Sequence, residues 1–292
     1  MRVTEGMIAN KYLFSHKQIT EKQMKIQTQL ASNSRIETLS DDVAGSLDAI
    51  NVNNQRKRTD AFLKNVQNAN NFVKASMNSL DRTIEEIQNI STAASSANNQ
   101  MVNQSYGTIA QSIKDSLNSI VQSINDKYNG MYLFGGTDFS GDPVSIDTNG
   151  KAVISATDHS GEIKVQISSN TKETMNIPGD KITGSGIFQA INDIIDSLDS
   201  GNQPTAAQLD ALTNANNKIL NVQSLAGEKV NRLDGMETIL TNQNTNYEEL
   251  LSNIQGIDPA KLSVELQEQD YLLQVSYKLL ANSFPKSVFD YL

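Results

Sequence analysis

The feature that most constrains the fold is an apolar repeat, at alternating steps of three and four residues, between Leu47 and Met101. This heptad spacing places the apolar residues in one stripe along an α-helix, which packs against a second helix. The repeat consists of Val66, Val73, Met77, Leu80, Ile84, Ile87, Ala94 and Met101, with Asn70 and Ser91 at two polar positions. No proline occurs between Met1 and Asp142, so no residue obliges this helix to break. A helix this long is not stable by itself, and other helices must cover its stripe.

Three later stretches carry the same helical spacing. Residues 106–128 place Ile109, Ile113, Leu117, Ile120 and Ile124 on one face. Beyond residue 210 the stripe comprises Ala226, Val230, Leu233, Leu240, Tyr247, Leu251 and Ile254. Asp258 and Pro259 then predict the start of another helix, with the aspartate as N-cap and the proline in the first turn.

Between these helices lies a segment of different composition, rich in glycine, from Gly135 to Gly186. Residues 162–168 alternate polar and apolar side chains, which predicts a half-buried strand. Asn149-Gly150 lies between two short apolar runs and predicts a β-hairpin. Residues 187–198 have the pattern of a short amphipathic helix that closes this region.

The predicted fold class is therefore mainly α with a small inserted β domain, arranged as an elongated, discontinuous α-helical bundle with coiled-coil termini. We expect an α-helical domain from residues 46–134 and 200–261, and an inserted β-rich domain from residues 135–199. Residues 1–45 and 262–292 are expected to be terminal coiled-coil segments that assemble with other subunits.

The terminal segments carry apolar residues that two helices alone cannot bury. We assign to the assembly surface the stripes Ile19, Ile26, Leu30, Leu266, Leu273 and Leu280, together with Tyr291 and Leu292. Because two helices bury too little to offset the entropy of ordering, we expect these ends to be disordered in the monomer and to order on assembly.

Composition excludes several functional classes. The absence of cysteine removes disulfides, thiolate metal sites and cysteine nucleophiles, and the two histidines, His16 and His159, have no partner at metal-ligand spacing. A net charge of −9 argues against nucleic acid as the main partner.

No run of about 18 apolar residues and no secretory signal pattern occur, so we expect no membrane insertion and no cleaved signal peptide. We expect no catalytic, cofactor-binding or metal-binding residue, and therefore no enzymatic activity and no cofactor.

Two short motifs are better explained by structure than by catalysis. Ser40-Asp41-Asp42 precedes a helical run, where acceptors and negative charge favour a helix start; a cation site is the alternative. The string Asn129-Gly130-Met131-Tyr132-Leu133-Phe134-Gly135-Gly136 joins helix to β region. Its residues alone predict a helix C-cap at Gly130 followed by a buried aromatic plug.

Several motifs in combination resemble the flagellin family, and within it the hook-associated proteins of type 3. They are the opening Met1-Arg2-Val3-Thr4, Arg35-Ile36 followed by Ser40-Asp41-Asp42, the hinge string 129–136, Gly227 with Asn231-Arg232-Leu233, and the ending Asp290-Tyr291-Leu292. The sequence departs from the family pattern at the glycine usual before Arg35 and at Val43, where proline is frequent.

The resemblance implies a structural axial protein of the bacterial flagellum at the junction between hook and filament. It implies export through the flagellar type III apparatus to the extracellular flagellum. The implied partners are the adjacent junction protein, flagellin, copies of the chain in a ring and an export chaperone. A short flagellin and a type III secreted coiled-coil effector or tip protein remain the alternatives.

Overall fold

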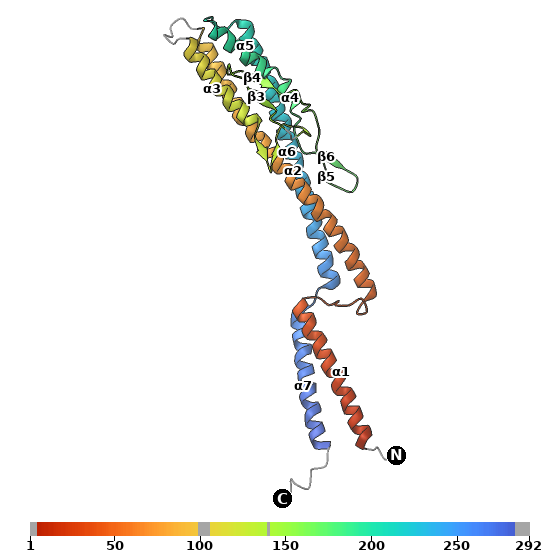
Figure 1. Ribbon diagram of the computed structural model, residues 1–292. Coiled ribbons are helices and arrows are strands. Elements are labelled where there is room, and N and C mark those ends of the chain that lie inside the picture. The colour runs from red at the N-terminus through yellow and green to blue at the C-terminus, as the bar shows by residue number, and fades with distance from the viewer. Residues whose placement is uncertain (1–4, 99–105, 139–140, 284–292) are drawn as a thin grey trace. The chain divides into compact units, whose positions relative to one another are not determined.

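The computed structural model describes residues 5–98, 106–138 and 141–283 (Figure 1). Its long helices are α1 (Glu5–Ser32), α2 (Val43–Ser96), α3 (Tyr106–Ile124), α5 (Ile187–Asp199), α6 (Ala206–Gln255) and α7 (Pro259–Ser283), and α4 (Asp180–Thr183) is a single turn. The strands are β1 (Lys127–Tyr128), β2 (Met131–Tyr132), β3 (Val144–Ile146), β4 (Ala152–Ile154), β5 (Lys164–Gln166) and β6 (Lys172–Thr174).

The strands form three separate antiparallel pairs, β1 with β2, β3 with β4 and β5 with β6. The protein is therefore mainly α with a small β insert, which confirms the predicted fold class. The hairpin predicted at Asn149-Gly150 is confirmed, because Ile146 pairs with Ala152 on either side of that turn. In the predicted strand 162–168, residues 164–166 are extended and pair with β6.

The chain folds into two compact units. Unit 1 contains residues 1–57 and 244–292, and unit 2 contains residues 58–243. Helices α2 and α6 therefore contribute residues to both units, whereas α1 and α7 belong entirely to unit 1.

The core of unit 2 is built from the predicted heptad stripes. On α2 the buried stripe residues are Val66, Val73, Leu80, Ile84, Ile87 and Ala94, and on α3 they are Ile109, Ile113, Leu117, Ile120 and Ile124. Helix α5 adds Ile187, Phe188, Ile191, Ile194, Ile195 and Leu198, and α6 adds Leu212, Ile219, Val222, Ala226, Leu233 and Leu240. All these side chains belong to one hydrophobic cluster, to which β insert residues such as Phe134 and Val144 also contribute.

A row of polar contacts joins α2 to α6 along the edge of this core. The amide of Gln67 donates to Glu237 at 2.9 Å, and Gln223 donates to Asp81. Between them, Asp234 accepts hydrogen bonds from Asn70 at 2.6 Å and Lys74 at 3.0 Å. From Gln67–Glu237 to Asn70–Asp234 to Asp81–Gln223, each step forward along α2 is matched by an equal step backward along α6, so these three pairs share one antiparallel register. Polar residues in an apolar seam disfavour other registers because a shift leaves them without partners.

Two helix boundaries differ from the sequence prediction. Helix α2 begins at Val43, before Leu47, and ends at Ser96; the predicted end at Met101 lies outside the described residues. Helix α3 ends at Ile124, and the interpretation of Gly130 as its C-cap is wrong. Asn129 and Gly130, with φ of 50° and 81°, form the two-residue turn of the β1–β2 hairpin. Two successive residues with positive φ define the type I′ turn, for which Asn-Gly is the preferred dipeptide.

Candidate assembly interface

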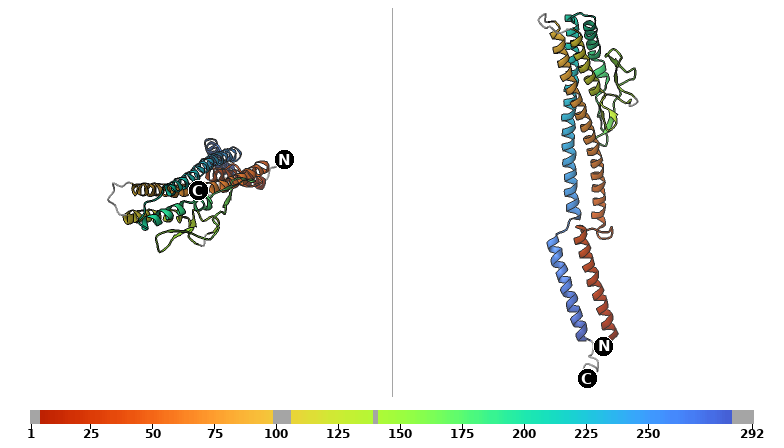
Figure 2. Two further views of the ribbon diagram at one scale, coloured as in Figure 1. Left: turned by 90° about the horizontal axis from the view of Figure 1, so that it is seen from above. Right: turned by 60° about the vertical axis from the view of Figure 1, so that its left-hand side comes forward.

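Helices α1 and α7 lie side by side and antiparallel in unit 1 (Figures 1 and 2). Helix α7 begins where the sequence predicts, because the carboxylate of Asp258 accepts from the backbone amides of Ala260 and Lys261 at 3.0 and 3.1 Å. Between the two helices, His16 Nε2 and the Tyr277 hydroxyl lie 2.9 Å apart.

The predicted assembly residues are only partly covered by this pairing. Ile26 is buried, and Ile19, Leu30, Leu266 and Leu273 are half-buried. The side chain of Leu280, together with Tyr291 and Leu292, lies outside the described residues. Two helices thus leave much of their apolar surface open, as expected for a pair without a third element to cover it.

The exposed apolar side chains of the described chain are concentrated in unit 1. Its large exposed hydrophobics are Met7, Leu13, Phe14, Met24, Leu39, Val43, Leu47, Ile50, Leu250, Val264, Tyr271, Leu272, Tyr277 and Leu279. The buried hydrophobics of the same unit are Ile26, Ile36 and Ala49. Exposed apolar surface on this scale is typical of a protein interaction site.

One part of this surface forms a groove between α1 and α7. Its α1 wall consists of Met7, Lys11, Tyr12, Ser15 and Ile19, and its α7 wall of Leu272, Val275, Ser276 and Leu279. The groove encloses about 710 Å³. Its lining is mostly apolar, with Lys11 as its charged residue.

The connection from α1 to α2 is held by the motif Arg35-Ile36. The guanidinium of Arg35 donates to the Asp42 carboxylate at 2.9 Å and to the backbone oxygen of Ile254 at 3.0 Å. Its backbone amide donates to Gln255 at 2.7 Å. Arg35 therefore ties the outgoing connection to the returning one at the end of α6. The next residue, Ile36, is buried.

The two aspartates of Ser40-Asp41-Asp42 have different roles. Asp42 caps α2 by accepting from the Gly45 amide at 2.9 Å, which confirms the predicted helix start. Asp41 accepts from Lys25 at 2.6 Å and from the backbone and hydroxyl of Thr38. The Lys25 ammonium, followed by the Thr38 bonds, lowers the pKa of the Asp41 carboxyl. The Gly45 amide and then Arg35 lower the pKa of Asp42. Ser40 lies beside Thr38, with the two hydroxyl oxygens 2.8 Å apart.

The motif 129–136 lies in unit 2 and anchors the β insert to the core. After the Asn129-Gly130 turn, Tyr132, Leu133 and Phe134 are buried, which confirms the predicted aromatic plug. The Leu133 amide donates to the backbone oxygen of Asp126 at 2.9 Å, and the Tyr132 hydroxyl donates to Asp142 at 2.5 Å.

The glycines that follow Phe134 permit close backbone packing against His159. Gly136 has φ of 65°, and a side chain there would meet the His159 backbone oxygen at 2.7 Å. A side chain on Gly179 would lie 1.9 Å from the backbone oxygen of Phe134. His159 is buried and contacts the backbone of Gly135, so its role in the structure is packing.

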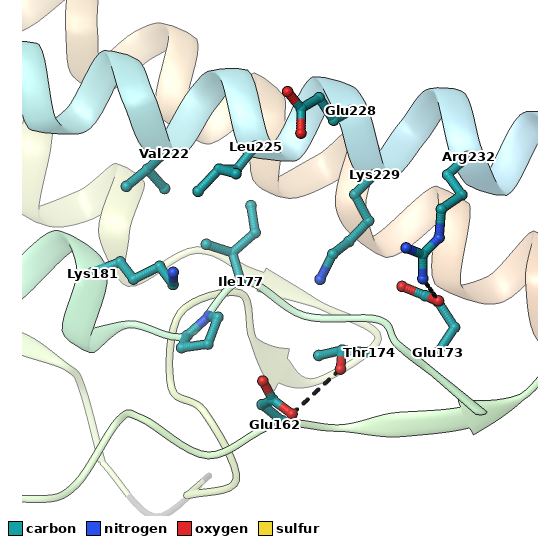
Figure 3. A pocket seen from close by; sticks show the side chains of 11 residues that line it. Glu162, Glu173, Thr174, Ile177, Lys181, Val222, Leu225, Glu228, Lys229 and Arg232 are labelled. Carbon is teal, nitrogen blue, oxygen red and sulfur yellow. Dashed lines mark hydrogen bonds and ion pairs between the residues drawn. The ribbon is translucent and has the colours of Figure 1, made fainter. Parts of the chain in front are cut away.

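The motif Asn231-Arg232-Leu233 lies on α6, opposite strand β6. Leu233 is buried in the core, Asn231 is exposed, and Arg232 forms an ion pair with the nearly buried carboxylate of Glu173 (Figure 3). Lys229, one turn earlier, donates to the backbone oxygen of Asn176 at 2.9 Å, and burial lowers its pKa. These contacts hold the insert against α6.

A cleft of about 370 Å³ lies between α6 and the insert beside these contacts. Its floor is apolar and its rim carries charges of both signs; it is lined by Glu162, Glu173, Thr174, Ile177, Pro178, Lys181, Val222, Leu225, Glu228, Lys229 and Arg232 (Figure 3). Because Glu173 pairs with Arg232 and Glu162 with Lys164, the two acidic groups that the insert contributes to the cleft already have cationic partners.

The described residues contain neither a metal-binding cluster nor a helix suited to span a membrane. Within them no group of three or more histidine or acidic side chains could hold a metal ion. In the same part of the chain, no helix combines the length and apolar character needed to cross a bilayer.

Comparison with known proteins places the chain in a family. The model of the bacterial flagellin N-terminal helical region matches residues 3–138, and that of the C-terminal helical region matches residues 209–292. Together the two matches cover most of the chain, which therefore belongs to the flagellin family. Among the curated proteins compared, none matches the sequence.

Several solved flagellar structures share this fold. A flagellar hook-associated protein from Vibrio parahaemolyticus is 19% identical, with a TM-score of 0.65, over 74% of this chain and 100% of that one. FlgL from Bacillus cereus is 16% identical, with a TM-score of 0.58, over 69% and 99%. The flagellar junction protein FlgL from Legionella pneumophila is 15% identical, with a TM-score of 0.55, over 73% and 100%. The chain thus has the fold of these hook-associated proteins. Its membership of the flagellin family makes it a structural protein of the flagellum.

Two parts of the exposed apolar surface of unit 1 were not predicted from the sequence. We assigned the inward stripes of the terminal helices but not the outward residues Leu13, Phe14 and Met24. Also missed were the exposed residues Val43, Leu47 and Ile50 at the start of α2 and Leu39 in the connection before it. The sequence does contain a signal for the second part, because the apolar residues 43, 47 and 50 have helical spacing. Leu47 was instead interpreted as the first residue of the apolar stripe that other helices of the chain cover.

Proposed function

We propose that this chain is a nonenzymatic axial subunit that forms the junction between the flagellar hook and filament. The observation that carries the proposal is the exposed apolar surface of unit 1, on the two terminal regions that the flagellin models match. Such a subunit can remove these exposed apolar side chains from water only by packing against other subunits. The similarity in fold to hook-associated structures favours the junction over other positions.

In this proposal the assembly partners contact α1, α7 and the start of α2. They are copies of the chain in a ring, the adjacent junction protein on the hook side and flagellin on the filament side. Export through the flagellar type III apparatus, with a chaperone that protects the chain before assembly, would deliver it to the extracellular flagellum. The Arg35 contacts support the assembly surface by holding both connections of unit 1 together.

A short flagellin is the second candidate, because both matching family models describe flagellin helical regions. The two functions differ in the position and number of subunits. Immunogold labelling of isolated flagella tests them directly, with an antibody against the β insert. The junction function predicts label only at the boundary between hook and filament. Label along the whole filament would overturn it in favour of flagellin.

A further inference from the structure

The cleft between α6 and the β insert contains two lysines that form no ion pair with any described residue. Lys229 extends from α6 and Lys181 from α4, and both ammonium groups point toward the space beside Ile177 (Figure 3). The acids that the insert contributes to the cleft are already paired with Arg232 and Lys164. The two lysines are therefore cations that remain open to a further anionic partner.

The surroundings of these lysines favour an added anion. Burial lowers the pKa of Lys229, the Glu162 carboxylate raises it, and the nearby charge of Lys181 lowers it again. The remaining acid of the lining, Glu228, is exposed on α6 and turns away from the cleft in Figure 3. A carboxylate between the two lysines would offset both the burial of Lys229 and its repulsion by Lys181.

The rest of the cleft is apolar. Ile177 and Val222 form its floor, each with 5% exposure, and Leu225 at its edge is 48% exposed. A volume of about 370 Å³ is near the lower end for ligand sites and holds a few side chains. The cleft therefore fits a segment that presents one acidic side chain close to short apolar ones.

The chain carries such a segment on the surface of its own insert, at residues 153–158. Val153 and Ile154 are 48% and 43% exposed, and Asp158 is exposed a few positions later. Asp158 accepts from the backbone amide of Ser160 at 2.9 Å, and no lysine or arginine of the described residues pairs with it. The segment thus offers the apolar and acidic groups that complement the cleft.

We propose that residues 153–158 of one subunit bind in the cleft of a second copy of the chain. The two apolar side chains of the segment pack against the floor of the cleft, which removes their surface from water. The Asp158 carboxylate lies between the ammonium groups of Lys181 and Lys229.

The dimensions of segment and cleft agree. From Ile154 to Asp158 an extended chain spans at most about 14 Å. From Val222 to Lys229 the cleft follows α6 for about 10 Å, at a helical rise of 1.5 Å per residue. One segment can therefore reach the apolar floor and the lysines together.

Within a single chain the segment is held outside the cleft. At one end Ile154 pairs with Val144 in the β3–β4 sheet. At the other end the backbone oxygen of His159 accepts from the Gly179 amide at 2.8 Å. The occupant therefore comes from another subunit.

The cleft and the segment are different surfaces of the chain, so the contact can repeat from one subunit to the next and close a ring. A ring of copies is part of the proposed function, on which this inference rests. The inference adds the residues through which neighbouring copies recognise one another.

Disulfide cross-linking in isolated flagella tests the contact, because the chain contains no cysteine of its own. Leu225→Cys and Ile154→Cys, on two copies produced in the same cells, place one thiol on each side. A disulfide needs the two Cβ atoms to lie about 4 Å apart, so oxidation should yield dimers only when both chains are present. Val153→Cys is a second choice for the segment, in case the first variant is not assembled.

Ile239→Cys is the matched control for the cleft position. Ile239 lies on the same helix as Leu225 with similar exposure, 53% against 48%, but does not line the cleft. The two positions are about 21 Å apart along α6. Ile239→Cys together with Ile154→Cys should therefore yield no dimer.

Charge reversal tests the role of the lysines. Lys181→Glu in the Leu225→Cys chain should lower the dimer yield severalfold, because it places a like charge beside Asp158. Lys172→Glu changes an exposed lysine of the insert that does not line the cleft, and it should leave the yield unchanged. Asp158→Lys in the Ile154→Cys chain should restore the yield against Lys181→Glu.

Four results would overturn the proposal. They are the absence of mixed dimers in flagella that contain both chains, an equal yield with the Ile239→Cys control, equal effects of the two lysine variants, and no recovery with Asp158→Lys.

Immunogold labelling of the same flagella separates this proposal from the proposed function. Label along the filament together with mixed dimers would overturn the junction function and retain the contact. Label at the junction without mixed dimers would overturn the contact alone.

Discussion

Replacement of Phe134 by alanine tests whether the motif 129–136 anchors the β insert to the core of unit 2. The side chain is 0% exposed and belongs to the hydrophobic cluster shared with α2, α3, α5 and α6. Removing a buried phenylalanine costs the transfer free energy of the ring plus that of the cavity left behind, about 3–5 kcal/mol. Since domains are stable by about 5–15 kcal/mol, the variant should be severely destabilised.

Urea unfolding followed by circular dichroism measures this change. We expect a lower midpoint with an unchanged slope, because the surface exposed on unfolding stays the same. In thermal unfolding the melting temperature should fall by roughly 6–20 °C for a unit of this size.

Phe14→Ala is the matched control, because Phe14 is 63% exposed on α1. It should change stability by no more than about 0.5 kcal/mol, as is usual for exposed positions. The same variant should impair assembly if the exposed surface of unit 1 is the interface. A loss below about 1 kcal/mol for Phe134→Ala, or equal losses for both variants, would refute this account of the motif.

Three further predictions concern other parts of the fold. Gly179→Ala should destabilise the protein by at least about 1–3 kcal/mol in urea unfolding, because the added methyl group meets a backbone oxygen at 1.9 Å. Gly235→Ala, in open space on α6, should instead stabilise it by about 0.4–1 kcal/mol; the reverse order would contradict the packing described. The pKa of Asp41 is lowered from its ordinary value of 3.8, so its contribution to stability is complete above about pH 4 and is lost as pH falls further. We therefore expect the free energy of unfolding of Asp41→Asn to fall less steeply than that of the parent protein as pH drops below about 4. Above about pH 6 the pH dependence of the two proteins should be the same. Asn70→Leu should not lower the melting temperature, because an apolar side chain suits the seam, but it should permit other registers; light scattering that shows one unchanged species would count against a register role.

The helices of unit 2 were predictable because their stripes are long and regular. A heptad sustained from Val66 to Ala94 has few alternatives to a helix covered by other helices, and the structure buries that stripe. The start of α7 was equally predictable, since Asp258 and Pro259 act through local hydrogen bonding and a fixed φ.

The β1–β2 hairpin was misinterpreted because glycine with positive φ ends helices and also forms tight turns. Gly130 is consistent with both uses. The discriminating feature is the asparagine before it together with the aromatic residues Tyr128 and Tyr132 on either side, which favour paired strands.

Contacts between distant segments could not be predicted from one sequence. The Arg35 guanidinium binds the backbone oxygen of Ile254, which lies 219 positions later in the chain. Any residue offers such an oxygen, so the sequence carries no signal for the partner. The exposed row at the start of α2 was missed for a related reason: apolar helical spacing identifies a face to be covered, but not whether the same chain covers it.

Deletion of the gene for this chain tests the proposed junction function most directly, through electron micrographs of the cells and assay of flagellin in the medium. We expect complete hooks without filaments and flagellin released as monomer, with both defects corrected by restoring the chain. Normal filaments on the hooks of the deletion strain would contradict it.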